Sequence, residues 1–182
     1  MKRFASIGLV LFLLSMEGCG GVSDFSREIY RKGFLASDPI AKEEVAALPM
    51  TGETGTHRYL ESAREIFTAR MTEMQPTIHP LSFSISPTKE VLEESDFASL
   101  KKTTSVRFLL QTELRQVEVV EGATQVRIEG RLWDIEQGHI LWEGVGESRG
   151  HLFLFFPTTP ASFEKAMEVA SRGLIQKLPI KK

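Results

Sequence analysis

The stretch RLWDIEQGHILWEGVGE, residues 131–147, is the most specific part of the sequence. A first run ends at Asp134, a turn contains Gly138, and the returning run carries Trp142. Asp134 can accept hydrogen bonds from turn amides, and Gly138 can take the positive φ that a tight turn requires. The stretch therefore predicts a β-hairpin, and we expect Trp142 to be a buried core residue. The structural residues of this hairpin are Trp133, Asp134, Gly138 and Trp142.

The runs on either side of this turn have the two-residue period of strands. Residues 106–120 alternate over much of their length and are rich in β-branched side chains. Residues 125–135 alternate again after a break at Gly122, and residues 139–148 follow the turn. Such alternation is typical of half-buried strands. The sequence therefore predicts an antiparallel meander of three strands.

The remaining elements show strand and helix patterns in turn. Strand patterns cover residues 44–50 and 80–86, and helix patterns cover residues 59–74, 88–102 and 160–178. The last helix is expected to begin at Pro160, with Thr159 as its cap. Helices with one apolar face pack on one side of a sheet. The sequence predicts an α+β fold: a two-layer domain over residues 41–180, in which a mixed sheet ends in the meander and carries helices on one face.

The first residues have the three-part layout of an export signal. Lys2 and Arg3 precede an apolar run at residues 4–14, and the small Gly18 stands directly before Cys19. An apolar run this short is typical of a secretory signal, because a permanent membrane span needs about 20 apolar residues. We therefore expect residues 1–18 to be a signal peptide.

Residues 19–40 are expected to be a tether between the export signal and the domain. They contain Gly-Gly, scattered Ser and charges of both signs, with little sustained periodicity. Such a composition is typical of a linker. A short helix over residues 25–32 is the one element that this segment suggests.

Composition and charge exclude several classes of protein. The chain has 182 residues, a formal net charge of −2 and a single cysteine. One cysteine excludes an internal disulfide framework and a metal site built from several cysteines. Nucleic-acid binding needs clustered Lys and Arg, so we expect no nucleic-acid partner.

Candidate catalytic groups do not form a recognisable set. The four histidines, His57, His79, His139 and His151, have no metal-ligand spacing. The loop TGETGT lacks the Gly-Lys-Ser/Thr of a phosphate-binding loop, and no serine stands in a Gly-x-Ser-x-Gly elbow. We therefore expect no catalytic residues, no metal and no cofactor, and predict that the protein is not an enzyme.

The apolar run at residues 4–14, followed by Gly18 and Cys19, resembles the lipobox of bacterial lipoproteins. The resemblance implies that the Cys19 thiol receives a diacylglyceryl group, that the chain is cut before it, and that the new amino terminus is acylated, palmitate being the expected chain. Gly20 is not the Asp that signals inner-membrane retention in enterobacterial lipoproteins. The resemblance therefore implies an outer-membrane lipoprotein that faces the periplasm.

The meander resembles that of a bacterial envelope family. FLLQTELRQ, residues 108–116, followed by the hairpin with Asp134, Gly138 and Trp142, is similar to the meander of the curli-secretion lipoprotein, of the outer-membrane lipoprotein activators of penicillin-binding proteins, and of the amino-terminal domain of the Tol translocation protein. The resemblance covers about residues 41–178. It implies a domain that binds and scaffolds, and it brings no catalytic residues.

The run HLFLFFP, residues 151–157, has two interpretations. It is a buried core strand, or it is an exposed loop that contacts a partner through Phe153, Phe155 and Phe156. The open edge of the sheet is the other expected contact surface. Two functions follow: a lipid-anchored adaptor or assembly factor that binds another envelope protein, or a membrane-tethered carrier of a lipid or small apolar ligand.

Overall fold

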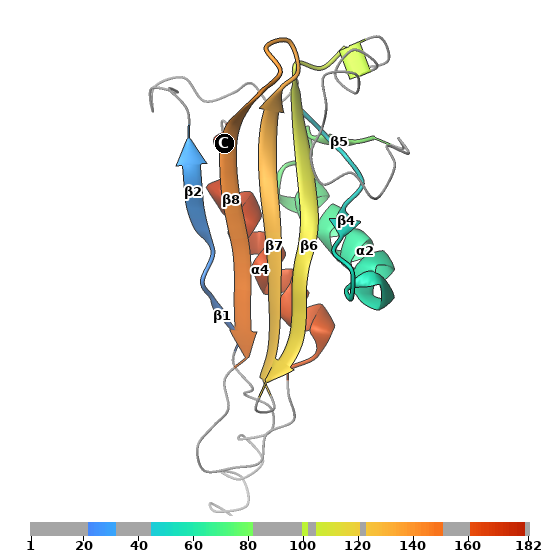
Figure 1. Ribbon diagram of the computed structural model, residues 1–182, viewed down its shortest axis with the longest axis vertical. Helices are drawn as coiled ribbons and strands as arrows, with labels where there is room; N and C mark the ends of the chain where they lie inside the picture. Colours follow the sequence, from blue (N-terminus) through green and yellow to red (C-terminus); the bar gives the residue numbers. More distant parts are fainter. Residues whose placement is uncertain are drawn as a thin grey trace, which may run out of the picture.

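The computed structural model describes residues 22–31, 45–81, 100–101, 105–120, 123–150 and 161–180. Within them, two helices pack on one eight-stranded open sheet (Figure 1). The strands are β1 (Val22–Asp24), β2 (Arg27–Arg31), β3 (Val45–Ala47), β4 (Thr51–Gly52), β5 (His79–Pro80), β6 (Phe108–Val120), β7 (Ala123–Asp134) and β8 (His139–Gly150). The helices are α2 (His57–Met74) and α4 (Phe163–Lys177).

The sheet is mixed and is centred on the long meander. Its order is β1-β8-β7-β6-β3-β5, with β2 also paired to β8 and β4 also paired to β6. The meander β6-β7-β8 is antiparallel, and β3 and β4 run parallel to β6. This arrangement confirms the predicted α+β two-layer fold with a C-terminal antiparallel meander.

The turn between β7 and β8 is stabilised by Asp134. Its Oδ1 accepts hydrogen bonds from the amides of Glu136 at 2.9 Å and Gln137 at 3.1 Å, and its Oδ2 pairs with Arg107 at 3.1 Å. Gly138 closes the turn with a φ of 68°, a conformation that L side chains rarely adopt. A buried carboxylate thus fixes the backbone at the point where the chain reverses.

The two helices form the second layer of the domain. Their apolar side chains Phe67, Met71, Met167 and Leu174 are buried against the meander. Arg70 of α2 pairs with Glu168 of α4 at 3.0 Å. Neither helix is long and apolar enough to cross a membrane.

Helix α4 begins later than predicted. Its N-cap is Ser162, whose hydroxyl accepts a hydrogen bond from the Lys165 amide at 3.3 Å, whereas the expected cap, Thr159, lies outside the described residues. The Ser162 hydroxyl and the backbone amide of Glu164 hold the pKa of the Glu164 carboxyl below its usual value, the backbone bond having the larger effect. An acidic side chain in the first turn suits the positive end of the helix dipole.

Glycines let α4 approach the sheet closely. Gly130 and Gly144 leave room for the indole of Trp142, and Gly146 faces the carbonyl oxygen of Ala170. A methyl group on Gly144 would collide with Trp142, and one on Gly146 would collide with the α4 backbone. Trp142 itself is 0% exposed. The indole and α4 therefore pack directly on the backbone of these glycines.

Residues 22–31 correct the predicted boundary of the domain. The short helix suggested over residues 25–32 is wrong, because these residues form β1 and β2, which pair antiparallel with β8. Val22 lies opposite Gly150, and Arg27 lies opposite Val145. Long-range pairing with β8 decides the conformation here, which local sequence patterns do not reveal.

Several predicted features lie outside the described residues. They are the signal peptide at residues 1–18, Cys19, residues 32–40 of the tether, most of the predicted strand at 80–86 and of the helix at 88–102, and Phe153, Phe155 and Phe156. Of the two predicted elements at 80–102, Pro80 is in β5, and Leu100 and Lys101 are helical.

Candidate interface at the open edge of the sheet

Exposed apolar side chains gather at the edge formed by β1, β2 and the two residues between them. Phe25 is 46% exposed, Ile29 is 56% exposed and Tyr30 is 42% exposed. Among the described residues, Val119, at the far end of β6, is the only other large apolar side chain that is exposed. We call Phe25, Ile29 and Tyr30 the edge cluster.

The backbone of this edge is open to pairing. Strand β2 pairs with β8 on one side, and no described strand pairs with its other side (Figure 1). The pairing register shifts between Glu28 and Tyr30, which leaves Ile29 as an extra residue in a β-bulge. An unpaired strand edge is a template for a strand of another protein, and the bulge interrupts its regularity.

Hydrogen bonds connect the edge to β8 and to the core. The indole N–H of Trp142 donates to the Glu28 carboxylate at 2.8 Å, and Arg31 donates to the same oxygen from Nη2 at 2.8 Å. Farther along, the Phe25 amide donates to the carbonyl of Glu147 at 2.8 Å, and the Glu147 amide donates to the hydroxyl of Ser26 at 3.2 Å. The edge cluster is therefore connected to the buried core through Glu28 and Trp142.

Charged side chains cover the face of the meander that points away from the helices. Glu129 accepts from Arg115 at 2.9 Å and from Arg127 at 3.1 Å. Arg131 pairs with Glu143 at 3.1 Å. We call this array, together with Glu113, Glu147, Arg149 and Arg27, the charged face. Opposite charges alternate across it, so it does not form the single-sign field that attracts a polyanion.

The charges of this face shift the titration of Glu129. Burial by itself would raise the pKa of the Glu129 carboxyl, but the hydrogen bond and charge of Arg115, followed by those of Arg127, hold it below its usual value. Glu129 is therefore an ionised centre between two arginines. A partner that approaches this face meets fixed charges of both signs, which favours selectivity over raw affinity.

The edge cluster lies where the open edge meets the charged face. The guanidinium of Arg149 lies 5.4 Å from the centre of the Phe25 ring, and Tyr30 lies opposite Glu143 in the β2–β8 pairing. Because Glu143 alternates with the helix-facing Trp142 along β8, Tyr30 belongs to the face that the helices leave open. Aromatic rings beside arginines are typical of protein interfaces.

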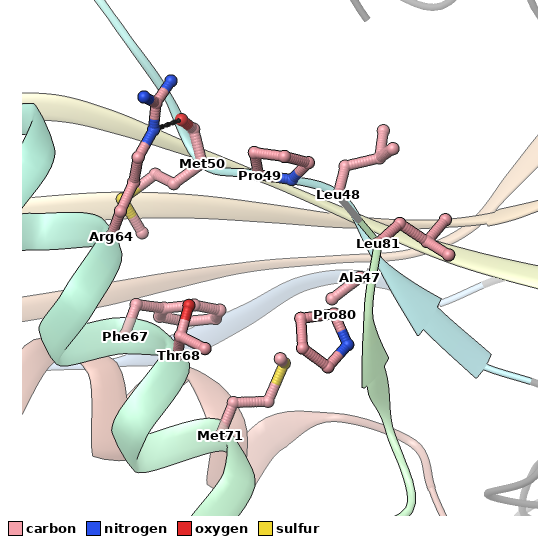
Figure 2. Close-up of a pocket in the computed structure, with 10 residues that line it drawn as sticks. All are labelled: Ala47, Leu48, Pro49, Met50, Arg64, Phe67, Thr68, Met71, Pro80 and Leu81. Carbon is pink, nitrogen blue, oxygen red and sulfur yellow. Dashed lines mark hydrogen bonds between the residues drawn. The ribbon is translucent and has the colours of Figure 1, made fainter. Parts of the chain in front are cut away.

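A small cavity lies between α2 and the short strands near β5 (Figure 2). Its volume is about 120 Å³, and Arg64 closes one side by donating to the Met50 carbonyl at 2.8 Å. It is lined by Ala47, Leu48, Pro49, Met50, Arg64, Phe67, Thr68, Met71, Pro80 and Leu81. Pockets for drug-sized ligands measure roughly 300–1,000 Å³. This cavity therefore does not favour the lipid-carrier alternative.

The histidines of the described residues stand apart from one another. His57 begins α2, His79 lies in β5 and His139 begins β8, while His151 lies outside the described residues. Among residues that the structure describes, no group of three or more His, Cys, Asp or Glu is placed to hold a metal ion.

The hairpin residues do not form one site. Trp142 packs on the helix side, whereas Trp133 belongs to a second apolar cluster on the opposite face and donates to the Gln111 side chain at 3.0 Å. An open edge of the sheet was predicted as a contact surface, but the residues of the edge cluster were not. Residues 25–31, FSREIYR, show no two-residue alternation of apolar and polar side chains, so no local pattern predicts a strand in this segment, which was assigned to a tether.

Comparison with known proteins supports the fold. No protein-family model matches the chain, and no curated protein matches its sequence. The PelC dodecamer from Paraburkholderia phytofirmans is similar in structure, with a TM-score of 0.61 at 12% identity, over 88% of this chain and 100% of the PelC chain.

Two other solved structures are similar over shorter stretches. The LpoB C-terminal domain from Salmonella enterica has a TM-score of 0.45 at 13% identity, over 60% of this chain and 85% of its own. Lipoprotein GNA1162 from Neisseria meningitidis has a TM-score of 0.41 at 16% identity, over 58% of this chain and 82% of its own. At these identities the likeness is one of fold, and the chain shares that fold with PelC.

Proposed function

We propose that this protein is a non-catalytic, lipid-anchored protein of the outer membrane, facing the periplasm, that binds another envelope protein as an adaptor or assembly factor. The observation that carries the proposal is the edge cluster, where Phe25, Ile29 and Tyr30 are exposed on an unpaired strand edge. Exposed apolar side chains that gather at one place on a soluble surface mark contact sites. PelC, which shares the fold, forms a dodecamer, so the crosslinking test below must also distinguish self-assembly from binding to a different protein.

The anchor is tested by the change Cys19→Ala. We expect this variant to appear in the soluble periplasmic fraction, because the acyl chains of Cys19 would supply the membrane affinity, at about 0.8 kcal/mol for each buried CH₂. A variant that sediments with membranes as tightly as the parent would show that the anchor is not at Cys19.

The contact site is tested by the double change Ile29→Ser and Tyr30→Ser. Both side chains are exposed, so the free energy of unfolding should change by no more than about 0.5 kcal/mol for each change. The partner protein crosslinked by the parent in cells should be lost. Val119→Ser is the matched control, because it removes an exposed apolar side chain of a strand far from the edge cluster.

Two results would contradict the proposed contact site. The first is a crosslinked partner that the double variant retains at the parent level. The second is an adduct that contains two copies of this chain and no other protein, which would mean self-assembly instead of binding to a different envelope protein. The Phe153 and Phe155 segment is the other predicted contact, and Phe153→Ser with Phe155→Ser tests it in the same assay.

A further inference from the structure

Four parts of the chain meet at one end of the sheet. Strand β1 begins there, because Val22 pairs with Gly150, the last residue of β8. Strands β6 and β7 also meet there, through the pairing of Val120 with Ala123. The hydroxyl of Thr124 donates to the carbonyl of Ala161, which places the start of α4 at the same end. We call this the Val22 end, and Figure 1 shows it opposite the turn that joins β7 to β8.

The chain between Cys19 and the sheet is very short. Three residue steps separate Cys19 from Val22, and an extended chain spans at most about 3.6 Å per residue, so the two lie within about 11 Å of each other. Strand β8 has 12 residues, which corresponds to about 40 Å at the rise of a β-strand. A lipid on Cys19 therefore keeps the Val22 end at the membrane and leaves the opposite end free to stand away from it.

The side chains at the Val22 end suit contact with a lipid surface better than those of the charged face do. Val119, 61% exposed, lies at this end, and its side chain is apolar. The open side of the sheet carries the charged face, whose ion pairs would have to be desolvated if the domain lay flat. Apolar side chains beside a lipid anchor add membrane affinity.

We infer that the domain stands upright on a phospholipid surface, with the Val22 end against the lipid and the β7–β8 turn farthest from it. This inference rests on the proposed anchor at Cys19. In this orientation β2 runs roughly parallel to the membrane normal. The edge cluster therefore faces sideways, toward a neighbouring protein on the same membrane. Among the described residues near the Val22 end, Asp24 and Glu118 are acidic and Arg149 is basic, so we do not expect this orientation to need anionic lipid.

The test uses the acylated full chain with one fluorophore at either end of the sheet. Acylation consumes the thiol of Cys19, so Val119→Cys and Gln137→Cys each provide a single labelling site on an exposed residue. Both proteins are reconstituted into phosphatidylcholine vesicles that carry a nitroxide on the lipid headgroup. Quenching by the nitroxide acts at short range, so we expect it to be several-fold stronger at position 119 than at position 137.

The outcomes separate the inference from the anchor on which it rests. Intact mass first establishes whether Cys19 carries acyl chains. Equal quenching at the two positions, or stronger quenching at position 137, in an acylated protein overturns the upright stance and leaves the anchor intact. A chain without acyl groups that does not bind the vesicles overturns both.

Discussion

Over the middle of the meander, the two faces carry opposite kinds of side chain on the same three strands, whereas toward the β7–β8 turn the open face carries the second apolar cluster with Leu109 and Trp133. Along β8, Trp142 and Gly146 face the helices, whereas Glu143 and Glu147 alternate with them and face away. On the covered face, packing is so close that glycines are required. On the open face, the side chains are held in place by ion pairs. The covered face therefore contributes most of the stability of the domain. The open face and its edge determine which partner proteins can bind.

The largest effect is expected at the covered face, from Trp142→Ala. The indole is fully buried, and its N–H bond to Glu28 links the core to β2. Removing it should cost about 3–5 kcal/mol of unfolding free energy. Denaturant unfolding measures this cost. A loss under about 1 kcal/mol would mean that the indole is not part of the core.

A smaller effect is expected from Gly146→Ala. This change adds volume to the covered face, whereas Trp142→Ala removes volume from it. The new methyl group would meet the Ala170 carbonyl and push α4 away from the sheet. Overpacking of this kind costs about 1–3 kcal/mol. Gly150→Ala is the matched control, because its nearest neighbour would be 3.3 Å away, and it should cost less. Equal costs for both variants would indicate that α4 does not press on β8.

The smallest effect is expected at the charged face, from Glu129→Gln. The folded pKa of Glu129 is lowered, so its charge stabilises the domain above the ordinary glutamate pKa of about 4.3 and this contribution is lost as the pH falls through the folded pKa. Unfolding followed from pH 7 to pH 3 should show a difference between parent and variant of up to about 1 kcal/mol that disappears at low pH. A constant difference across this range would contradict the assigned ionisation.

The covered face was predictable because its signals are local. The alternation in β6, β7 and β8 and the turn at Asp134 and Gly138 are readable from neighbouring residues, and the stripe of apolar residues in α4 has the helical period. The start of α4 was placed too early because Thr159-Pro160 and Ser162 are competing caps, and the structure uses Ser162.

An open edge was expected, but the residues that form it could not be predicted, because their partner β8 is distant in sequence. Glu28 and Trp142, which connect the edge to the core, are 114 residues apart, and no local pattern joins them. Residues 22–31 contain charges and a Gly-rich neighbourhood that are typical of a linker, and pairing with β8 overrides that tendency. The edge cluster, which carries the proposed function, was therefore invisible until β2 had been placed beside β8.

Site-specific photocrosslinking in cells shows whether the edge cluster binds a different envelope protein. A photoreactive phenylalanine analogue replaces Tyr30 in one strain and Val119 in another, with the full chain anchored in its own membrane. We expect a covalent adduct with another envelope protein from position 30 and no such adduct from position 119. If position 30 gives no adduct, or if both positions give the same adduct, the edge cluster is not the site that binds another envelope protein.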